Sequence, residues 1–191
     1  MQRLDLLYKW VKNKTKVFLA NNKLATQKEI KFKRCGNYIV MLHVSRNTTT
    51  NELRFGVKDK RFAQFRAAKA GCVAIYDCLH PENSISICQN TFWYANKVYY
   101  RVGHITTANS FDPNVNEVCS TGIHYFNHWL AAYYYDSSSS YWRIDPFYIS
   151  FSNNGKIRRI NRQSEMEYKK IFTHFYGCEA IQMRFHLDPF P

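Results

Sequence analysis

The order of predicted strands and helices is the feature that most constrains this fold. Short runs of β-forming residues recur along the chain between polar turns, as in NYIVMLHV at 37–44. Further strands are predicted at 71–79, 91–102 (two strands), 122–126, 142–151 and 179–187. Helices interrupt them without the regular β-α-β rhythm of a parallel sheet. We therefore expect an α+β protein, a single compact domain with a mostly antiparallel sheet and a few helices.

Four segments are predicted to be helical. The N-terminal segment places leucine, tryptophan and valine at helical spacing, which predicts a short amphipathic helix. In residues 59–70, Ala and Phe lie at helix-compatible spacing behind an initial Asp. Asn127 is placed to cap a helix over 128–135. The segment 164–174 opens with the spacing of a capping box, which indicates a helix start.

The distribution of charge favours acidic partners. The 191 residues include 27 Lys and Arg against 14 Asp and Glu, a formal net charge of +13. Residues 1–34 hold ten basic and two acidic residues, a net +8. Such a field attracts polyanions such as nucleic acid, anionic lipid or an acidic protein surface. We predict a basic N-terminal arm or helix over 1–34 and one α+β domain over 35–191.

Two basic segments supply the candidate contact residues. The second segment, 156–170, carries six basic and two acidic residues, and its clustered arginines suit bidentate recognition of phosphate or carboxylate. The residues predicted to make contacts are Lys9, Lys12, Lys14, Lys16, Lys31, Lys33, Arg34, Lys156, Arg158, Arg159 and Arg162.

Catalytic and metal-binding patterns are weak. The chain has neither a GxxxxGK[ST] loop nor a GxGxxG loop. His124 and His128 are four residues apart, but the strand predicted over 122–126 breaks the helical geometry that a metal pair would need. Cys119 with His124 or His128 could form a thiolate pair, and a structural cysteine beside a turn is the alternative. We predict no catalytic residue, no metal and no cofactor.

The cysteines and aromatic residues point to a packed interior. None of the six cysteines forms a C-x-x-C pair and most have apolar neighbours, which predicts buried free thiols in a reducing compartment. The stretch 125–151 holds eleven aromatic residues and one basic residue, Arg143. We expect these rings to fill the core and a protein interface rather than to stack on single-stranded nucleic acid. No stretch approaches the length of a transmembrane helix.

Three segments together resemble a known family. They are FRAAKAGCVAI at 65–75, YYRVGHITTANSFDPN at 99–114 and VCSTGIHYFNHWLAAYYY at 118–135. In that order they are similar to an uncharacterised domain family of large double-stranded DNA viruses of amoebae, whose members often carry pentapeptide or MORN repeats. The matching positions are Arg66, Lys69, Ala70, Tyr100, Val102, Gly103, Cys119, Gly122, Ile123, His124, Tyr125, Phe126, Ala132 and Tyr135. We expect Gly122 to be required by backbone geometry and Cys119 by packing.

A second resemblance is to ADP-ribosyltransferases. The segments 41–49, 122–135 and 178–185 follow the order of that family's active-site strands. The corresponding residues are His43, His124 and Glu179. His124 stands where the family has its catalytic Tyr, and Val44 replaces the Gly that follows the first His. The resemblance therefore implies a related fold that has lost catalysis.

Charge and resemblance together predict a structural role. We expect a non-enzymatic component of a large DNA virus particle, a minor capsid, cement or core protein. It would be made in the host cytoplasm, and its basic surface would contact other virion proteins, packaged DNA or the inner membrane surface. The alternatives are a nucleic-acid-associated basic protein and an inactive ADP-ribosyltransferase-like domain.

Overall fold

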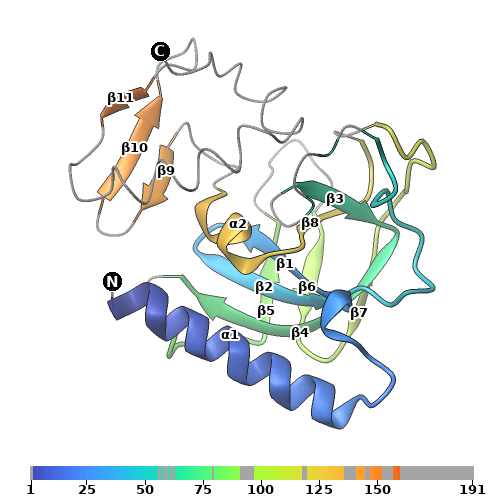
Figure 1. The fold of residues 1–191 in the computed structure, drawn as a ribbon, viewed down its shortest axis with the longest axis horizontal. Helices are drawn as coiled ribbons and strands as arrows, with labels where there is room; N and C mark the ends of the chain where they lie inside the picture. The colour runs from blue at the N-terminus through green and yellow to red at the C-terminus, as the bar shows by residue number, and fades with distance from the viewer. Residues whose placement is uncertain are drawn as a thin grey trace.

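The fold is built on one six-stranded sheet (Figure 1). Side by side, its strands are β3 (Gln64–Ala67), β8 (Ile123–Phe126), β1 (Ile30–Cys35), β2 (Tyr38–His43), β4 (Lys69–Asp77) and β7 (Ile105–Thr107). Every neighbouring pair is antiparallel. This computed structural model describes residues 2–55, 57, 60, 63–78, 80–90, 97–117, 120–135, 141–144, 147–151 and 157–159.

Two smaller sheets and two helices complete the described chain. Strands β5 (Ile87–Gln89) and β6 (Tyr99–Arg101) form an antiparallel pair, and β9 (Tyr141–Ile144), β10 (Phe147–Phe151) and β11 (Ile157–Arg159) form a three-stranded sheet. The helices are α1 (Gln2–Asn21) and α2 (Trp129–Tyr134), with a 3-10 turn, η1 (Gln27–Glu29), before β1. The predicted α+β class with a mostly antiparallel sheet and one compact domain is confirmed.

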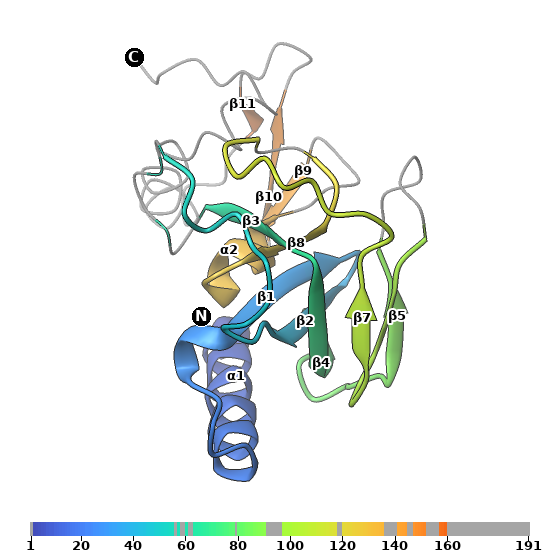
Figure 2. The same ribbon diagram turned by 90° about the vertical axis from the view of Figure 1, so that its right-hand side faces the viewer.

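Helix α1 lies along one face of the sheet (Figures 1 and 2). Its 20 residues correspond to about 30 Å of helix. Leu7 and Val11 are buried, and the Trp10 ring lies 6.1 Å from the ring of Tyr76 on β4. These apolar residues recur three and four positions apart, so they form the single stripe that docks on the sheet. The helix is longer than the short one predicted, and neither described helix has the length and apolar character of a membrane span.

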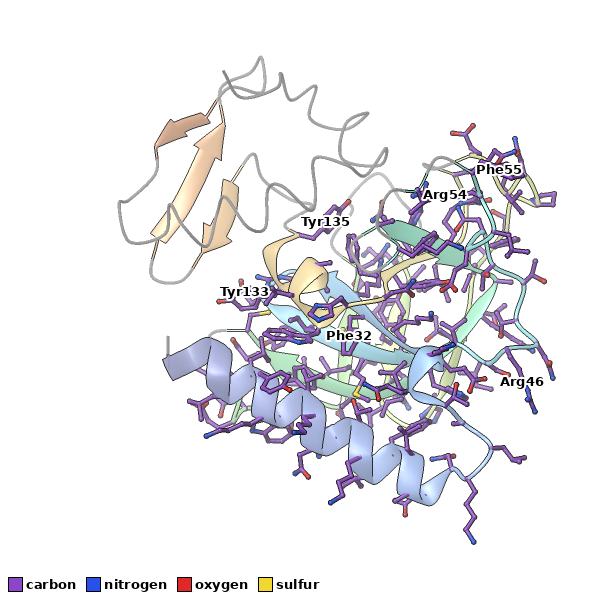
Figure 3. The ribbon with its side chains drawn as sticks, viewed as in Figure 1. Phe32, Arg46, Arg54, Phe55, Tyr133 and Tyr135 are labelled. Carbon is purple, nitrogen blue, oxygen red and sulfur yellow. The ribbon has the colours of Figure 1, made fainter. Side chains whose placement is uncertain are left out.

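Strand β1 is covered on both faces, and all six of its residues are buried. Side chains alternate between the faces of a strand, so Phe32 and Arg34 lie on one face and Lys31, Lys33 and Cys35 on the other. On the first face, α2 contributes Tyr133, which lies under the Arg34 guanidinium. Figure 3 shows Phe32 in the centre of the molecule, with the labelled tyrosines of α2 and its C-terminal end above it.

The helix predicted over 59–70 is wrong. The described part of that segment forms β3 and the start of β4. Residues 64–67, QFRA, are all buried and pair along their length with β8. The spacing of Ala and Phe in this segment is compatible with a helix. Pairing with the distant strand β8 nevertheless makes it a strand, because tertiary contacts commonly override local propensity.

Other local predictions fared better. Strands within 37–44, 71–79, 122–126 and 142–151 are confirmed, the last as the pair β9 and β10. Of 91–102, the described part contains β6. Helix α2 confirms the prediction over 128–135, but its N-cap is His128, whose ring accepts from the Leu130 N–H at 3.2 Å, and not Asn127. The elements predicted at 164–174 and 179–187 lie outside the described residues.

Candidate binding surface

The outer face of α1 carries a row of lysines. Lys9, Lys12 and Lys16 are exposed, and Asp5 is the single acidic residue of the helix. At 100° and 1.5 Å per residue, the three lysines lie within about 60° around the helix and span about 10 Å of its axis. We call Lys9, Lys12 and Lys16 the α1 lysine row. Lys14 is half-buried, and its ammonium lies 4.8 Å from the centre of the Trp10 ring.

The other predicted contact lysines and arginine of the N-terminal segment face inward. Lys31, Lys33 and Arg34 are all buried on β1, so the predicted boundary after residue 34 falls inside a strand of the central sheet. Each of these three charged side chains donates hydrogen bonds to side-chain or main-chain oxygens inside the protein. The exposed basic surface of the segment is therefore that of α1 together with the exposed Lys23 and Lys28 that follow it.

Lys31 is part of a polar network on β1. Its ammonium lies 2.6 Å from Glu52 Oε1 and 2.7 Å from Asn127 Oδ1, and 7% of its side chain is exposed. The Tyr125 hydroxyl donates to the same Glu52 oxygen at 2.8 Å. Burial, followed by the Glu52 charge, raises the pKa of Tyr125. The arrangement keeps Glu52 bonded to two donors and fixes the loop that carries it against β1 and β8.

Lys33 and Arg34 bind main-chain oxygens. Lys33 donates to the carbonyl of His124 at 3.1 Å, and its ammonium lies 5.9 Å from the centre of the Tyr100 ring. Arg34 donates to the carbonyls of Gly36 and Tyr133, the latter at 2.9 Å. These contacts join β1 to β8 and α2, which is a structural role.

Arg66 is the centre of the cluster formed by the family-like motif. Its side chain is fully buried, and its two terminal nitrogens donate to four main-chain carbonyl oxygens of one loop. These are the carbonyls of Asp112 (3.2 Å), Thr121 (2.9 Å), Asn114 (2.8 Å) and Glu117 (2.8 Å). The guanidinium also lies 5.4 Å from the centre of the Phe111 ring. We call this set of contacts the Arg66 clamp.

Gly122 makes room for the Arg66 clamp. Its φ of +140° lies where side chains are rarely tolerated, and a Cβ there would meet Arg66 Cβ and a Phe111 ring carbon, each at 3.2 Å. The prediction that backbone geometry requires Gly122 is thus confirmed. Gly103, with φ +80° and open space around it, needs glycine for conformation alone.

The remaining motif residues have different surroundings. Lys69 is exposed on β4 and Val102 is exposed after β6, whereas Tyr135 packs on Phe126 with ring centres 5.0 Å apart. The other buried members are Ala70, Tyr100, Ile123, Tyr125, Phe126 and Ala132. Among the aromatic residues of the stretch 125–151 whose burial the structure describes, the buried ones are Tyr125, Phe126, Trp129, Tyr133 and Tyr135, which confirms the predicted core role for these.

The residues considered for chemistry do not converge in the described structure. His128 caps α2, His124 lies half-buried on β8, and His43 packs on Phe18 with ring centres 5.1 Å apart. Within the described residues, no three His, Cys, Asp or Glu side chains are grouped so as to hold a metal ion. Cys119, Glu179 and the side chains of Lys156, Arg158, Arg159 and Arg162 lie outside what is described.

The described cysteines are free thiols. Cys35, Cys72 and Cys78 are buried and Cys88 is half-buried, which confirms the prediction of unpaired internal cysteines for this part of the chain.

Comparisons with known proteins identify one family. A family model with the description "Family of unknown function (DUF5758)" matches residues 11–132. This range starts within α1 and ends within α2, so it includes Lys12 and Lys16 of the α1 lysine row and the whole Arg66 clamp. No curated protein and no solved structure matches the chain.

Proposed function

This chain belongs to DUF5758, a family of unknown function, and we propose that it is a basic structural component of a viral particle that binds an acidic partner through the α1 lysine row. The viral setting extends the resemblance carried by the CSTGIHYF segment. The observation that supports the binding role is the placement of Lys9, Lys12 and Lys16 together on the solvent side of a docked helix.

The docking of α1 is what makes the lysine row a defined surface. The apolar stripe of the helix packs on the sheet, so the backbone that carries the lysines is already ordered before a partner binds. Lysines act as compact point charges, which suit phosphate groups or surface carboxylates without base-specific readout. We therefore propose weakly specific, salt-sensitive binding, with duplex DNA as the first partner to test.

The test is DNA binding across a salt series. The chain is mixed with two DNA duplexes of unrelated sequence, and the dissociation constant is measured at several salt concentrations. We expect a steep linear fall of log K with log salt and similar affinity for both duplexes. The triple variant Lys9→Glu, Lys12→Glu, Lys16→Glu should reduce the salt slope by about 3, since each lost lysine–phosphate contact removes about one unit.

A matched variant separates the lysine row from overall charge. Lys60, Lys69 and Lys97 are exposed lysines outside α1. Changing these three to Glu lowers the net charge from +13 to +7 (each change removes 2), as the α1 variant does. This control should keep most of the binding. Equal losses in both variants would contradict a defined surface on α1. Failure of the wild-type chain to bind DNA at low salt, with binding to an acidic protein of the particle, would shift the partner to protein.

The particle assignment has its own test. Purified particles of the encoding virus, separated into layers, should contain the chain in stoichiometric amounts. Its confinement to infected-cell extracts would contradict a structural role while leaving polyanion binding intact.

A further inference from the structure

We propose that one side of the protein docks on an anionic phospholipid bilayer through three exposed apolar side chains and three exposed basic ones. The apolar residues are Leu24, Leu53 and Phe55, and the basic residues are Lys23, Lys28 and Arg46. We call these six residues the bilayer face. None of them belongs to the α1 lysine row, so this inference goes beyond the proposed function and does not depend on DNA binding.

The apolar residues of the bilayer face are the most exposed of their kind. Leu24 is 86% exposed, and Leu53 and Phe55 are each 81% exposed, the highest values among the large apolar residues whose burial the structure describes. All three lie in turns rather than in a helix or strand. Single exposed apolar residues are normal on a protein surface, whereas several on one side beside charged residues mark an interaction site.

The two turns that carry these residues lie on the same side of the molecule. Helix α1 ends at this side, and the turn with Leu24 follows it before η1 (Figure 1). Figure 3 shows Arg46 and Phe55 on this side as well, with Phe55 above Arg46. Figure 2 views the side directly, with the end of α1 below and the segment that leads to Phe55 above. One flat surface can therefore reach both turns.

Hydrogen bonds fix the first turn beside the loop that carries Arg46. The Ala25 N–H donates to the Asn22 carbonyl at 2.9 Å. The Glu29 carboxylate accepts from the N–H groups of Thr26 at 2.7 Å and Arg46 at 2.8 Å. This buried carboxylate thus holds the chain around Leu24 and the chain around Arg46 together.

The second turn is equally well held. The Arg54 N–H donates to the Asn51 carbonyl at 3.2 Å, and the Phe55 N–H donates to Asn116 Oδ1 at 3.4 Å. Asn51 Oδ1 accepts from the Arg66 N–H at 2.7 Å, which ties the turn to β3. Turns that are ordered beforehand lose little backbone freedom on binding, which favours insertion of the side chains they carry.

The charge around Leu24 selects an anionic surface. The three basic residues of the bilayer face are exposed, and the single acidic residue of the segment 22–51, Glu29, is buried. Basic side chains close to a membrane are attracted by the acidic headgroups of its lipids. This end of the bilayer face therefore supplies the electrostatic attraction.

The end that carries Leu53 and Phe55 supplies apolar contact. The Glu52 carboxylate is bonded to Lys31 and Tyr125, and Glu117 in the neighbouring loop is exposed, so positive charge does not dominate here. A bilayer offers an apolar layer beneath its charged headgroups, into which such side chains can enter. DNA has no comparable layer on its outer surface, so the bilayer fits this combination of side chains better.

The experiment measures vesicle binding by the full chain. Vesicles of phosphatidylcholine alone, or of phosphatidylcholine mixed with phosphatidylserine, are incubated with the protein at physiological ionic strength and recovered by flotation. We expect binding to the mixed vesicles and much weaker binding to phosphatidylcholine alone. The triple variant Leu24→Ser, Leu53→Ser, Phe55→Ser should bind the mixed vesicles at least about tenfold more weakly, because it loses the side chains that enter the bilayer.

A matched apolar variant tests whether the position of these residues matters. Ile87→Ser, Tyr99→Ser, Ile105→Ser removes three exposed apolar side chains from β5, β6 and β7 and should bind the mixed vesicles like the wild-type chain. Both triple variants keep the net charge of the wild type, and both should keep its affinity for DNA, which also shows that they are folded.

A second pair of variants tests the basic residues. Changing Lys23, Lys28 and Arg46 to Gln should weaken binding to the mixed vesicles at least about tenfold. The equal change of net charge at the exposed Lys69, Lys97 and Arg101 should retain most of the binding.

Hydrogen exchange locates the contact independently of the variants. We expect slower exchange in residues 22–28 and 51–55 when the mixed vesicles are present. Wild-type affinity in the Leu24, Leu53, Phe55 variant would overturn the bilayer face, since binding would then depend on charge alone. Equal losses in the two apolar variants would overturn it as well. If the wild-type chain bound DNA but not the mixed vesicles, this inference would fail and the proposed role of the α1 lysine row would stand.

Discussion

Arg66 is a buried cation that is balanced by main-chain dipoles. Its two terminal nitrogens reach four carbonyls of one loop, and Gly122 leaves space beside it. Such contacts contribute little net energy while they are complete, but each buried carbonyl left without a donor costs about 1–3 kcal/mol. At the scale of single residues, the motif therefore encodes a loop conformation.

Replacing Arg66 should expose this dependence. Arg66→Met removes every donor of the clamp, and we expect the free energy of unfolding to fall by at least about 3 kcal/mol. Arg66→Lys should lie between, because one ammonium cannot span both pairs of carbonyls. Urea denaturation gives the values. The control is Lys69→Met, which alters an exposed basic residue of the same motif and should change stability by about 0.5 kcal/mol or less. Equal effects at the two positions would refute the clamp.

Glu29 gives a pH-dependent contribution at the same scale. Its carboxylate accepts from the N–H groups of Arg46 at 2.8 Å and Thr26 at 2.7 Å, and these bonds, the Arg46 bond first, lower its pKa. A lowered pKa stabilises the fold at a pH above the unfolded value of about 4.3, and this stabilisation disappears as the pH falls through the folded value.

The corresponding variant is Glu29→Gln. The wild-type chain should be more stable than the variant at pH 7, and the difference should shrink steadily below pH about 4.3. Thermal unfolding between pH 7 and pH 3 measures it. Glu82→Gln, at an exposed carboxylate, serves as the control and should leave the wild-type pH profile nearly unchanged. A constant difference between wild type and Glu29→Gln at all pH values would refute the assignment.

At the scale of elements, α1 both packs on the sheet and carries the exposed lysines. Leu7 and Val11 bury its inner stripe, and the α1 lysine row occupies the outer face. In a folded protein, an amphipathic helix such as α1 gains most of its stability from packing its apolar face rather than from helix propensity. The integrity of the proposed binding surface therefore depends on the buried stripe.

Two adjacent leucines test this dependence. Leu7 is fully buried and Leu6 is 48% exposed. Leu7→Ala should cost about 2–5 kcal/mol through lost burial and a cavity, whereas Leu6→Ala should cost well below that range. Chemical denaturation followed by circular dichroism measures both. If the two variants were equally stable, α1 would not be docked as described.

At the scale of the whole molecule, the sequence predicts the fold class better than the placement of charge. The strand runs at 37–44 and 71–79 are recognisable because β-branched and aromatic residues mark them locally. The inward side chains of Lys31, Lys33 and Arg34 were missed, because their partners come from Glu52, Asn127, Tyr133 and the main chain near residue 124. Alternating cations on a strand look like an exposed face until the distant segments that cover them are known.

The candidate binding surface likewise combines features that the sequence predicts with features that it does not. The α1 lysine row follows from helical spacing and was within reach of the sequence. The motif residues were found by resemblance, but the role of Arg66 was not. Its partners are main-chain carbonyls, and because every residue has one, the sequence does not show which carbonyls Arg66 binds.

The Arg66 clamp determines which sequence changes the loop bound by Arg66 can tolerate. The Arg66 guanidinium donates to the main-chain oxygens of Asp112, Asn114, Glu117 and Thr121, so these four bonds do not depend on which side chains those residues carry. They do depend on the number of peptide units between the bonded carbonyls. Substitutions at exposed positions such as Pro113 should therefore be accepted, whereas inserting or deleting a single residue should disorder the loop, in contrast to ordinary surface loops, which absorb changes in length easily.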